Sequence, residues 1–119
     1  MQEKLEKVLE VKFFANESGN EPVREWLKEL PIEEKKSIGR DIATVQYEWP
    51  IGKPLVDNLG NGLWEVRTKL KNKIARIIFL INDGKMILLH GFIKKTQKTP
   101  KPDLDLANKR AKTFFRGNK

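Results

Sequence analysis

The stretch at residues 64–81 carries basic side chains in a pattern that suits phosphate chemistry. Arg67, Lys69 and Lys71 occupy every second position, whereas Arg76 stands alone in an apolar run. The guanidinium group of arginine can hold phosphate oxygens with two parallel hydrogen bonds. A lysine crowded by other cations has a lowered pKa, so its amine can act as a base or as an acid. These residue types therefore suit phosphate binding and proton transfer.

A second group of polar side chains follows a later apolar stretch. His90 is the only histidine of the chain, and Lys94 and Lys95 come shortly after it. Because adjacent residues of a strand point to opposite faces, the two lysines should point in different directions. A basic loop comes next, and its Lys98 and Lys101 are candidate contacts to a nucleic-acid backbone.

Each of these residues also has a structural interpretation. Arg67 alternates with apolar residues, as any solvent-facing strand position does. Arg76 lies among isoleucines, where a charge is costly unless it faces a site or is paired, for example with Glu65 or Asp83. A lone histidine on an apolar strand is usually a hydrogen-bonded core residue, and Phe92 can pack in the core or stack on a base.

The composition excludes several classes of protein. The chain has no cysteine and one histidine, which excludes disulfides, thiolate metal sites and multi-histidine metal sites. We therefore expect no metal and no cofactor. No apolar run approaches the roughly 20 residues that span a bilayer, and the charged N-terminus lacks the apolar core of a signal peptide. The sequence predicts a cytoplasmic protein without a membrane partner.

Charge is distributed unevenly along the chain. The formal net charge is +8, yet residues 1–60 hold 9 Lys or Arg and 12 Asp or Glu. Residues 61–119 hold 15 Lys or Arg and only 4 Asp or Glu. Solubility alone needs no such segregation, so the basic half indicates a polyanionic partner.

The elements that must position these side chains are predicted by the apolar periodicity. An apolar stretch at 8–14 indicates a first strand, and helical spacing indicates helices at 21–30 and 32–48. The period then changes to two, and turn residues such as Asn72 and the Asn-Asp-Gly sequence separate the strands. The chain is predicted to form one α+β domain, residues 1–119, in the order β-α-α-β-β-β-α. Its later elements are strands at 63–71, 74–81 and 85–93 and a final helix that begins at Asp103 or Asp105.

The pleat of the predicted sheet assigns side chains to two faces. An open, basic face is expected to carry Arg67, Lys69 and Arg76, with Lys94 and Lys95 at its end. The helix-facing side is expected to carry Trp64, Val66 and Leu70, and on the third strand His90 is grouped with Met86, Leu88 and Phe92.

These residues carry a resemblance that spans residues 8–115. The chain has "GLWEVR" ending at Arg67, an isolated Arg76 in an apolar strand, "LLHGFIKKTQKTP", and a helix with Ala107 and Arg110. This combination resembles the RelE/ParE superfamily of toxins from toxin–antitoxin pairs, and within it the HigB-like branch related to phage proteins. One departure is Ala75, where many members have an aromatic residue that could stack on a base.

The resemblance implies a RelE-like fold, with a curved antiparallel sheet packed on two N-terminal helices. It also implies an endoribonuclease that cuts messenger RNA in the ribosomal A site. Cleavage by the 2′-hydroxyl of the RNA needs a base, stabilisation of charge on phosphorus and a proton for the leaving oxygen, and no metal is required. The expected catalytic residues are Arg67, Arg76, His90, Lys94 and Lys95. The expected RNA-binding residues are Lys69, Lys71, Lys98, Lys101 and Phe92. The sequence does not assign the general base and the general acid among Lys69, His90, Lys94 and Lys95.

The partners that the resemblance implies are the ribosome with its mRNA and a HigA-like helix-turn-helix antitoxin. Operator DNA is contacted only indirectly, through that antitoxin. The antitoxin could cover the basic face, or it could dock on the acidic helices that carry Glu25, Glu29, Glu33 and Glu34. Two other functions remain open at this stage: a ParE-like gyrase poison that cleaves nothing, and a nucleic-acid-binding module without catalysis.

Overall fold

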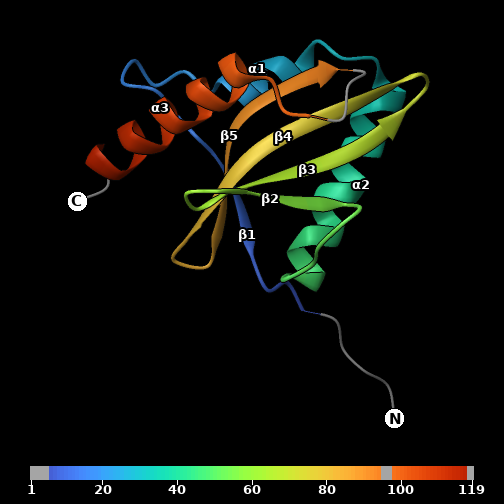
Figure 1. Ribbon diagram of the computed structural model, residues 1–119, viewed down its shortest axis with the longest axis horizontal. Helices are drawn as coiled ribbons and strands as arrows, with labels where there is room; N and C mark the ends of the chain where they lie inside the picture. The colour runs from blue at the N-terminus through green and yellow to red at the C-terminus, as the bar shows by residue number, and fades with distance from the viewer. Residues whose placement is uncertain (1–5, 95–97, 118–119) are drawn as a thin grey trace.

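The computed structural model describes residues 6–94 and 98–117, which form a five-stranded sheet with helices on both faces (Figure 1). The strand order across the sheet is β1-β5-β4-β3-β2. β1 runs parallel to β5, and the other neighbouring strands are antiparallel. The elements are β1 (Glu10–Phe13), α1 (Pro22–Lys28), α2 (Ile32–Glu48), β2 (Val56–Gly60), β3 (Leu63–Leu70), β4 (Lys73–Asn82), β5 (Lys85–Lys94) and α3 (Lys101–Gly117).

The α+β class and most of the predicted elements are confirmed. The helix at 32–48 has the predicted bounds, and the three strands of the predicted meander are β3, β4 and β5. Their turns contain Asn72 with φ 62° and Asp83 with φ 53°, in the left-handed region that asparagine and aspartate tolerate. α3 begins at Lys101, two residues before the first predicted start.

Two predictions about the sheet are wrong. The sheet is mixed, because β1 pairs in parallel with β5 rather than joining an antiparallel array. The strand β2 was not predicted at all, so the observed order is β-α-α-β-β-β-β-α. β2 pairs with the first half of β3 only, from Val56 opposite Val66 to Gly60 opposite Leu63.

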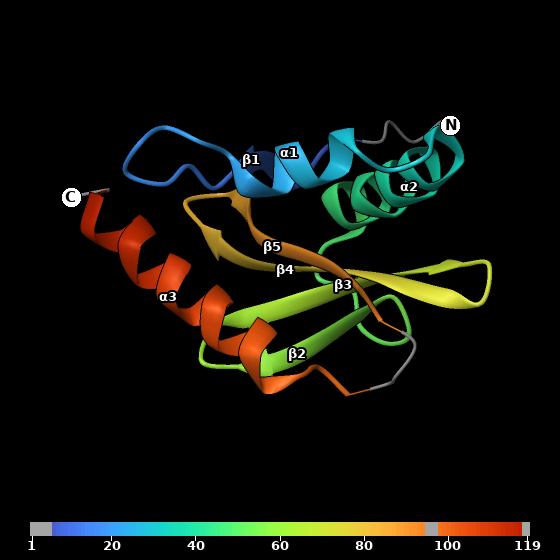
Figure 2. The same cartoon turned by 90° about the horizontal axis from the view of Figure 1, so that it is seen from above.

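Helices cover the two faces of the sheet from opposite sides (Figure 2). α1 and α2 contribute Val23, Ile38, Ile42 and Val45 to one apolar cluster, together with Val66 of β3. α3 closes a second cluster on the other face. That cluster contains Leu63, Ile78, Leu80, Ile87, Leu89, Phe92 and Ala107. Within the part of the chain that the structure describes, no helix is long and apolar enough to cross a membrane.

A bulge in β5 corrects the predicted facing of His90. Ile78 lies opposite His90 whereas the next residue of β4, Phe79, lies opposite Leu88, so Leu89 is an extra residue. An extra residue shifts the alternation of the strand by one. Met86 and Leu88 therefore lie on the face of α1 and α2, whereas His90 and Phe92 lie on the α3 face. The grouping of His90 with Met86 and Leu88 is wrong.

α3 holds this bulge through Arg110. Its Nη1 donates a hydrogen bond of 2.8 Å to the carbonyl oxygen of Leu89. Burial lowers the pKa of the Arg110 guanidinium from its ordinary value. Ala107, one helical turn earlier, is fully buried against the sheet. The Ala and Arg spacing of the final helix thus fixes α3 to the irregular point of β5.

Candidate functional site

The register of the three central strands gathers the predicted site residues on the α3 face. Directly opposite residues of an antiparallel pair have Cβ atoms about 5 Å apart, so each row across the sheet is a set of close neighbours. The sharing of one face by Arg67, Lys69 and Arg76 is confirmed, but the prediction that this face is open is wrong, because α3 packs on part of it and Arg76 is fully buried. The rows, from β3 through β4 to β5, are Glu65–Ile78–His90, Arg67–Arg76–Phe92 and Lys69–Ile74–Lys94.

Arg67 lies between two carboxylates. Its Nε donates to Oε1 of Glu65 at 2.8 Å, and its Nη2 donates to Oδ2 of Asp57 on β2 at 3.1 Å. The side chain is 19% exposed, so part of the guanidinium faces solvent. Two charged hydrogen bonds on a planar group restrict its orientation. Arg67 is therefore a preoriented cation at the edge of the site.

Arg76 is fully buried beside Arg67. Its exposed fraction is 0%, and its Nη1 lies 3.5 Å from Oε1 of Glu65, which is also 0% exposed. Burial lowers the pKa of the Arg76 guanidinium, and the nearby Glu65 carboxylate opposes this shift. The ion pair with Glu65 that the sequence allowed is present. Arg76 thus lies beneath the solvent-facing part of the site, and the carboxylate beside it is that of Glu65 rather than Asp83.

Glu65 joins these groups into one network. Its Oε1 accepts from Arg67 and lies near Arg76, and its Oε2 accepts a hydrogen bond of 2.8 Å from the hydroxyl of Thr99. A buried carboxylate requires such compensation, because its transfer from water is costly. Glu65 therefore connects the segment before α3 to the two arginines of the sheet.

His90 pairs with the first turn of α3. Its Nε2 lies 2.7 Å from Oδ1 of Asp103, and its ring stacks on Phe92 with centroids 5.2 Å apart. Phe92 is 7% exposed and belongs to the apolar cluster under α3. Both residues therefore connect β5 to α3, and core packing is the observed role of Phe92.

The lysines supply the solvent-facing charge of the site. Lys69, Lys71, Lys94 and Lys98 are exposed. Lys101 is exposed as well and forms an ion pair of 3.0 Å with Asp105 along α3. Lys95, a predicted catalytic residue, lies outside the described residues. Because Asp57 and Glu65 compensate the two arginines, the positive potential here comes mainly from these lysines.

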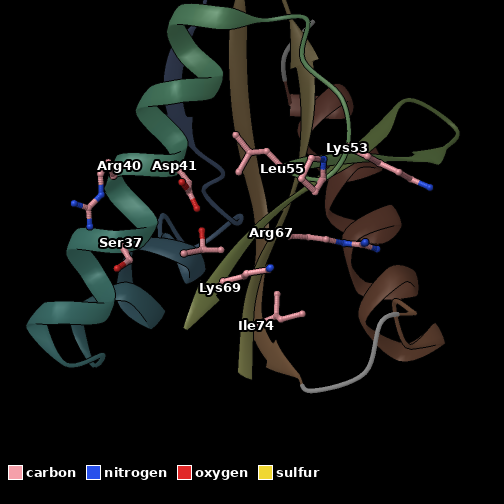
Figure 3. Close-up of a pocket in the computed structure, with 10 residues that line it drawn as sticks. Ser37, Arg40, Asp41, Lys53, Leu55, Arg67, Lys69 and Ile74 are labelled. Carbon is pink, nitrogen blue, oxygen red and sulfur yellow. The ribbon is translucent and has the colours of Figure 1, made fainter. Parts of the chain in front are cut away.

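A groove of about 810 Å³ borders this face. It runs between α2 and the edge of β3, next to the segment before β2 (Figure 3). In Figure 3, Asp41 points from α2 toward the strands, whereas Lys53 and Arg67 extend away from α2. The lining residues are Ser37, Arg40, Asp41, Lys53, Pro54, Leu55, Arg67, Thr68, Lys69 and Ile74.

Comparison with known families gives one match over most of the chain. Residues 25–112 match the family described as phage-derived protein Gp49-like (DUF891). The chain belongs to the Gp49-like family. This family is RelE-like and is associated with the toxins of toxin–antitoxin pairs. No curated protein matches this Gp49-like chain at a significant level.

Sequence reasoning missed four polar residues of the site in this Gp49-like protein. Asp57 was missed because β2 was not predicted, and Asp103 was considered only as a helix start. Glu65 was considered as a motif residue and as a partner for Arg76 but not for Arg67, although its spacing of two from Arg67 placed both on one face. Thr99 was noted only as part of the "KKTQKTP" motif, and its contact with Glu65 could not be foreseen because the two residues are 34 positions apart. Among the described residues, no group of three or more His, Cys, Asp or Glu side chains could hold a metal ion.

Proposed function

We propose that this Gp49-like protein is the toxin of a HigB-like pair and cleaves ribosome-bound mRNA through the 2′-hydroxyl of the RNA. The observation that carries the proposal is the row Arg67–Arg76–Phe92, with His90 and Lys94 in the adjacent rows of the same face. Within the family, such a clustering of cations is consistent with contact to a scissile phosphate. The ribosome would supply much of the substrate positioning.

In this proposal Arg67 contacts the phosphate, because it is partly exposed and already oriented by Glu65 and Asp57. A preoriented donor stabilises developing charge without reorganisation during the reaction. Arg76 is buried and therefore acts through Glu65, whose negative charge it balances. That balance reduces the hold of Glu65 on Arg67 and leaves Arg67 able to attract a phosphate.

Proton transfer is assigned to the groups that flank the arginine row. Lys69 and Lys94 are exposed and lie on either side of Ile74, two strands apart. His90 is held by Asp103 through Nε2, which leaves Nδ1 as its other proton-carrying atom. Lys95 remains a candidate as well. The proposal keeps base and acid within this set.

The toxin family also suggests a cognate antitoxin, and we propose a helix-turn-helix protein that also carries any operator contact. The ribosome as target places the protein in the cytoplasm in this proposal. The proposal keeps two alternatives for where the antitoxin binds. It covers the basic face, or it docks on the acidic helices.

A second candidate is a nucleic-acid-binding module that does not cleave. One observation favours it: Arg67 and Arg76 both lie beside carboxylates, which is also what arginines with a purely structural role do. A gyrase poison has no comparable observation in its favour.

Mapping mRNA ends after incubation with translating ribosomes tests these candidates. The nuclease is expected to cut within the A-site codon, and naked RNA should be cut far more slowly. Inhibition of supercoiling without RNA cuts would instead identify a gyrase poison. RNA binding with neither mRNA cuts nor inhibition of supercoiling would identify the binding module, and the proposed nuclease would then be wrong.

A further inference from the structure

The outer edge of β3 is only partly covered by β2. Pairing between these strands ends at Val56 opposite Val66, after which the Arg67 amide donates to the Leu55 carbonyl at 2.9 Å. The amide and carbonyl directions alternate along a strand, so those of Lys69 point to the same outer side. Among the described residues, no strand pairs with Lys69 on that side. The edge of β3 near its hairpin therefore presents backbone donors and acceptors outward.

This edge opens into the groove of about 810 Å³ beside α2. Lys69 lies on the strand side of the groove, and Arg40 and Lys53 lie on its other walls, all three exposed. Asp41 is the one acidic residue of the lining. Leu55 and Ile74 add apolar surface that is half-buried. The groove thus combines a strand edge, excess positive charge and small apolar contacts.

We propose that this groove binds an extended, acidic segment of a partner protein, which adds to the sheet as a further strand beside β3. A peptide backbone supplies the alternating donors and acceptors that the edge of Lys69 requires, whereas a sugar–phosphate backbone does not. Acidic side chains on the peptide match Arg40, Lys53 and Lys69.

A second copy of the chain fits this edge less well. Antiparallel pairing of two β3 edges would bring Lys69 and Lys71 of both copies close together. Like charges directly opposite each other on neighbouring strands are destabilising. Lysines at a strand edge also disfavour pairing with an identical edge. The same lysines attract an acidic strand, which is why we assign the edge to a different protein.

The proposal does not depend on nuclease activity. A bound strand would lie against Arg67 and Lys69, so it would also obstruct the proposed RNA face if that face is functional. Binding itself needs no RNA and no ribosome. A protein that fails to cut mRNA but binds the peptide contradicts the proposed nuclease and leaves the proposed groove standing. A protein that cuts mRNA but does not bind the peptide contradicts the groove and leaves the nuclease standing.

The first test uses the full chain and a fluorescent octapeptide of alternating Glu and Val. Saturable binding is expected, and the exchange of the Lys69 amide should slow by about tenfold at saturation, since that amide becomes bonded. The Leu70 amide, which points to β4, serves as the internal control. A peptide N-methylated at every residue keeps the charge but lacks the donors, and it should lose most of the binding.

The second test changes the groove charges. The double variant Arg40→Glu with Lys53→Glu should bind the peptide roughly tenfold more weakly, because two attractions become repulsions. Lys12→Glu, on the strand at the opposite edge of the sheet, is the matched control and should bind as the unchanged protein does.

Four results would overturn the proposal. The first is no binding of the parent peptide at concentrations up to about 1 mM. The second is equal binding of the N-methylated peptide, which would mean charge attraction alone. The third is protection of the Lys69 amide by single-stranded RNA rather than by peptide, with a response to the double variant. The fourth is protection of the Lys69 amide without any peptide in a self-associated protein, which would make a second copy the occupant.

Discussion

At the scale of single residues, one buried carboxylate organises the candidate site. Glu65 accepts from Arg67 and Thr99 and balances the buried Arg76. A buried charge needs a partner of opposite sign. If one member of the pair is removed, the other charge stays buried without compensation, which is costly in free energy. Glu65 and Arg76 should therefore be coupled in stability, whereas Arg67, at the surface, should matter mainly for function.

Glu65→Gln is expected to destabilise the fold by about 3 kcal/mol, because it leaves the Arg76 charge buried without its counter-charge. Arg76→Met should cost a comparable amount for the converse reason. The double variant should lose less than the sum of the two single changes, and urea unfolding of all four proteins measures this. Strict additivity would contradict the coupling.

Arg67→Ala is expected to keep the fold and to lower ribosome-dependent cleavage by roughly 10²–10³, the typical effect of losing one donor to developing charge. The rate of appearance of cut mRNA ends measures it, with circular dichroism as the folding check. Lys12→Ala on the far edge of the sheet is the control. A folded Arg67→Ala protein that cuts at the normal rate would remove Arg67 from the proposed mechanism.

At the scale of elements, the close approach of α1 to β5 depends on a missing side chain. A Cβ at Gly91 would lie 2.4 Å from Cε3 of Trp26 on α1, which is well inside contact distance. The indole thus lies against the backbone of β5, next to the residues that face the site. This contact fixes the distance between the helix layer and the strand that carries His90.

Gly91→Ala should therefore destabilise the protein by about 1–3 kcal/mol, as overpacked cores do. Gly39→Ala is the matched control, because nothing lies within 4 Å of its added Cβ in α2. Alanine in a helix interior should stabilise by roughly 0.5–1 kcal/mol. Thermal unfolding compares the two variants, and adding Trp26→Leu to Gly91→Ala should restore part of the loss. Equal effects of both glycine changes would contradict the close packing.

The sequence predicted those elements whose local signals are strong. It did not predict features that depend on the pairing of one strand with another. The apolar spacing of α2 and the turn residues Asn72 and Asp83 are local, and their predictions hold. β2 contains Asn58 and Gly60, which resemble loop residues, and only its pairing with β3 makes it a strand. The bulge at Leu89 leaves no trace in the alternation of letters, so the facing of His90 could not be foreseen. The roles of the site residues remain predictions.

At the scale of the whole molecule, charge segregation follows the fold. The lysines of the basic half that face solvent lie along the β3–β4 hairpin, at the end of β5, before α3 and along α3 itself. The glutamates at 25, 29 and 33 lie in or next to α1 and α2, which cover the opposite face of the sheet. The excess positive charge thus lies mainly on the side of the sheet away from α1 and α2, which is the side suited to a polyanion.

RNA binding should accordingly depend steeply on salt, because each phosphate contact releases counterions. Lys69→Glu combined with Lys94→Glu should weaken binding of a single-stranded oligonucleotide and reduce the slope of log affinity against log salt by roughly 1–2. Fluorescence anisotropy across a salt series measures both. Charge reversal at Lys12 should leave the slope unchanged, and a slope that is insensitive to Lys69 and Lys94 would place RNA elsewhere.

The extra residue at Leu89 has a consequence for how this chain can change during evolution. The bulge, rather than residue identity, decides which side of the sheet His90 and Phe92 occupy, because regular pairing of all residues from Leu88 onward would turn both rings toward α1 and α2. Loss of Leu89 would instead restore strict alternation and leave both rings on the α3 face, because His90 would then directly follow Leu88. Relatives that keep this site should therefore either retain the bulge or lack the residue equivalent to Leu89.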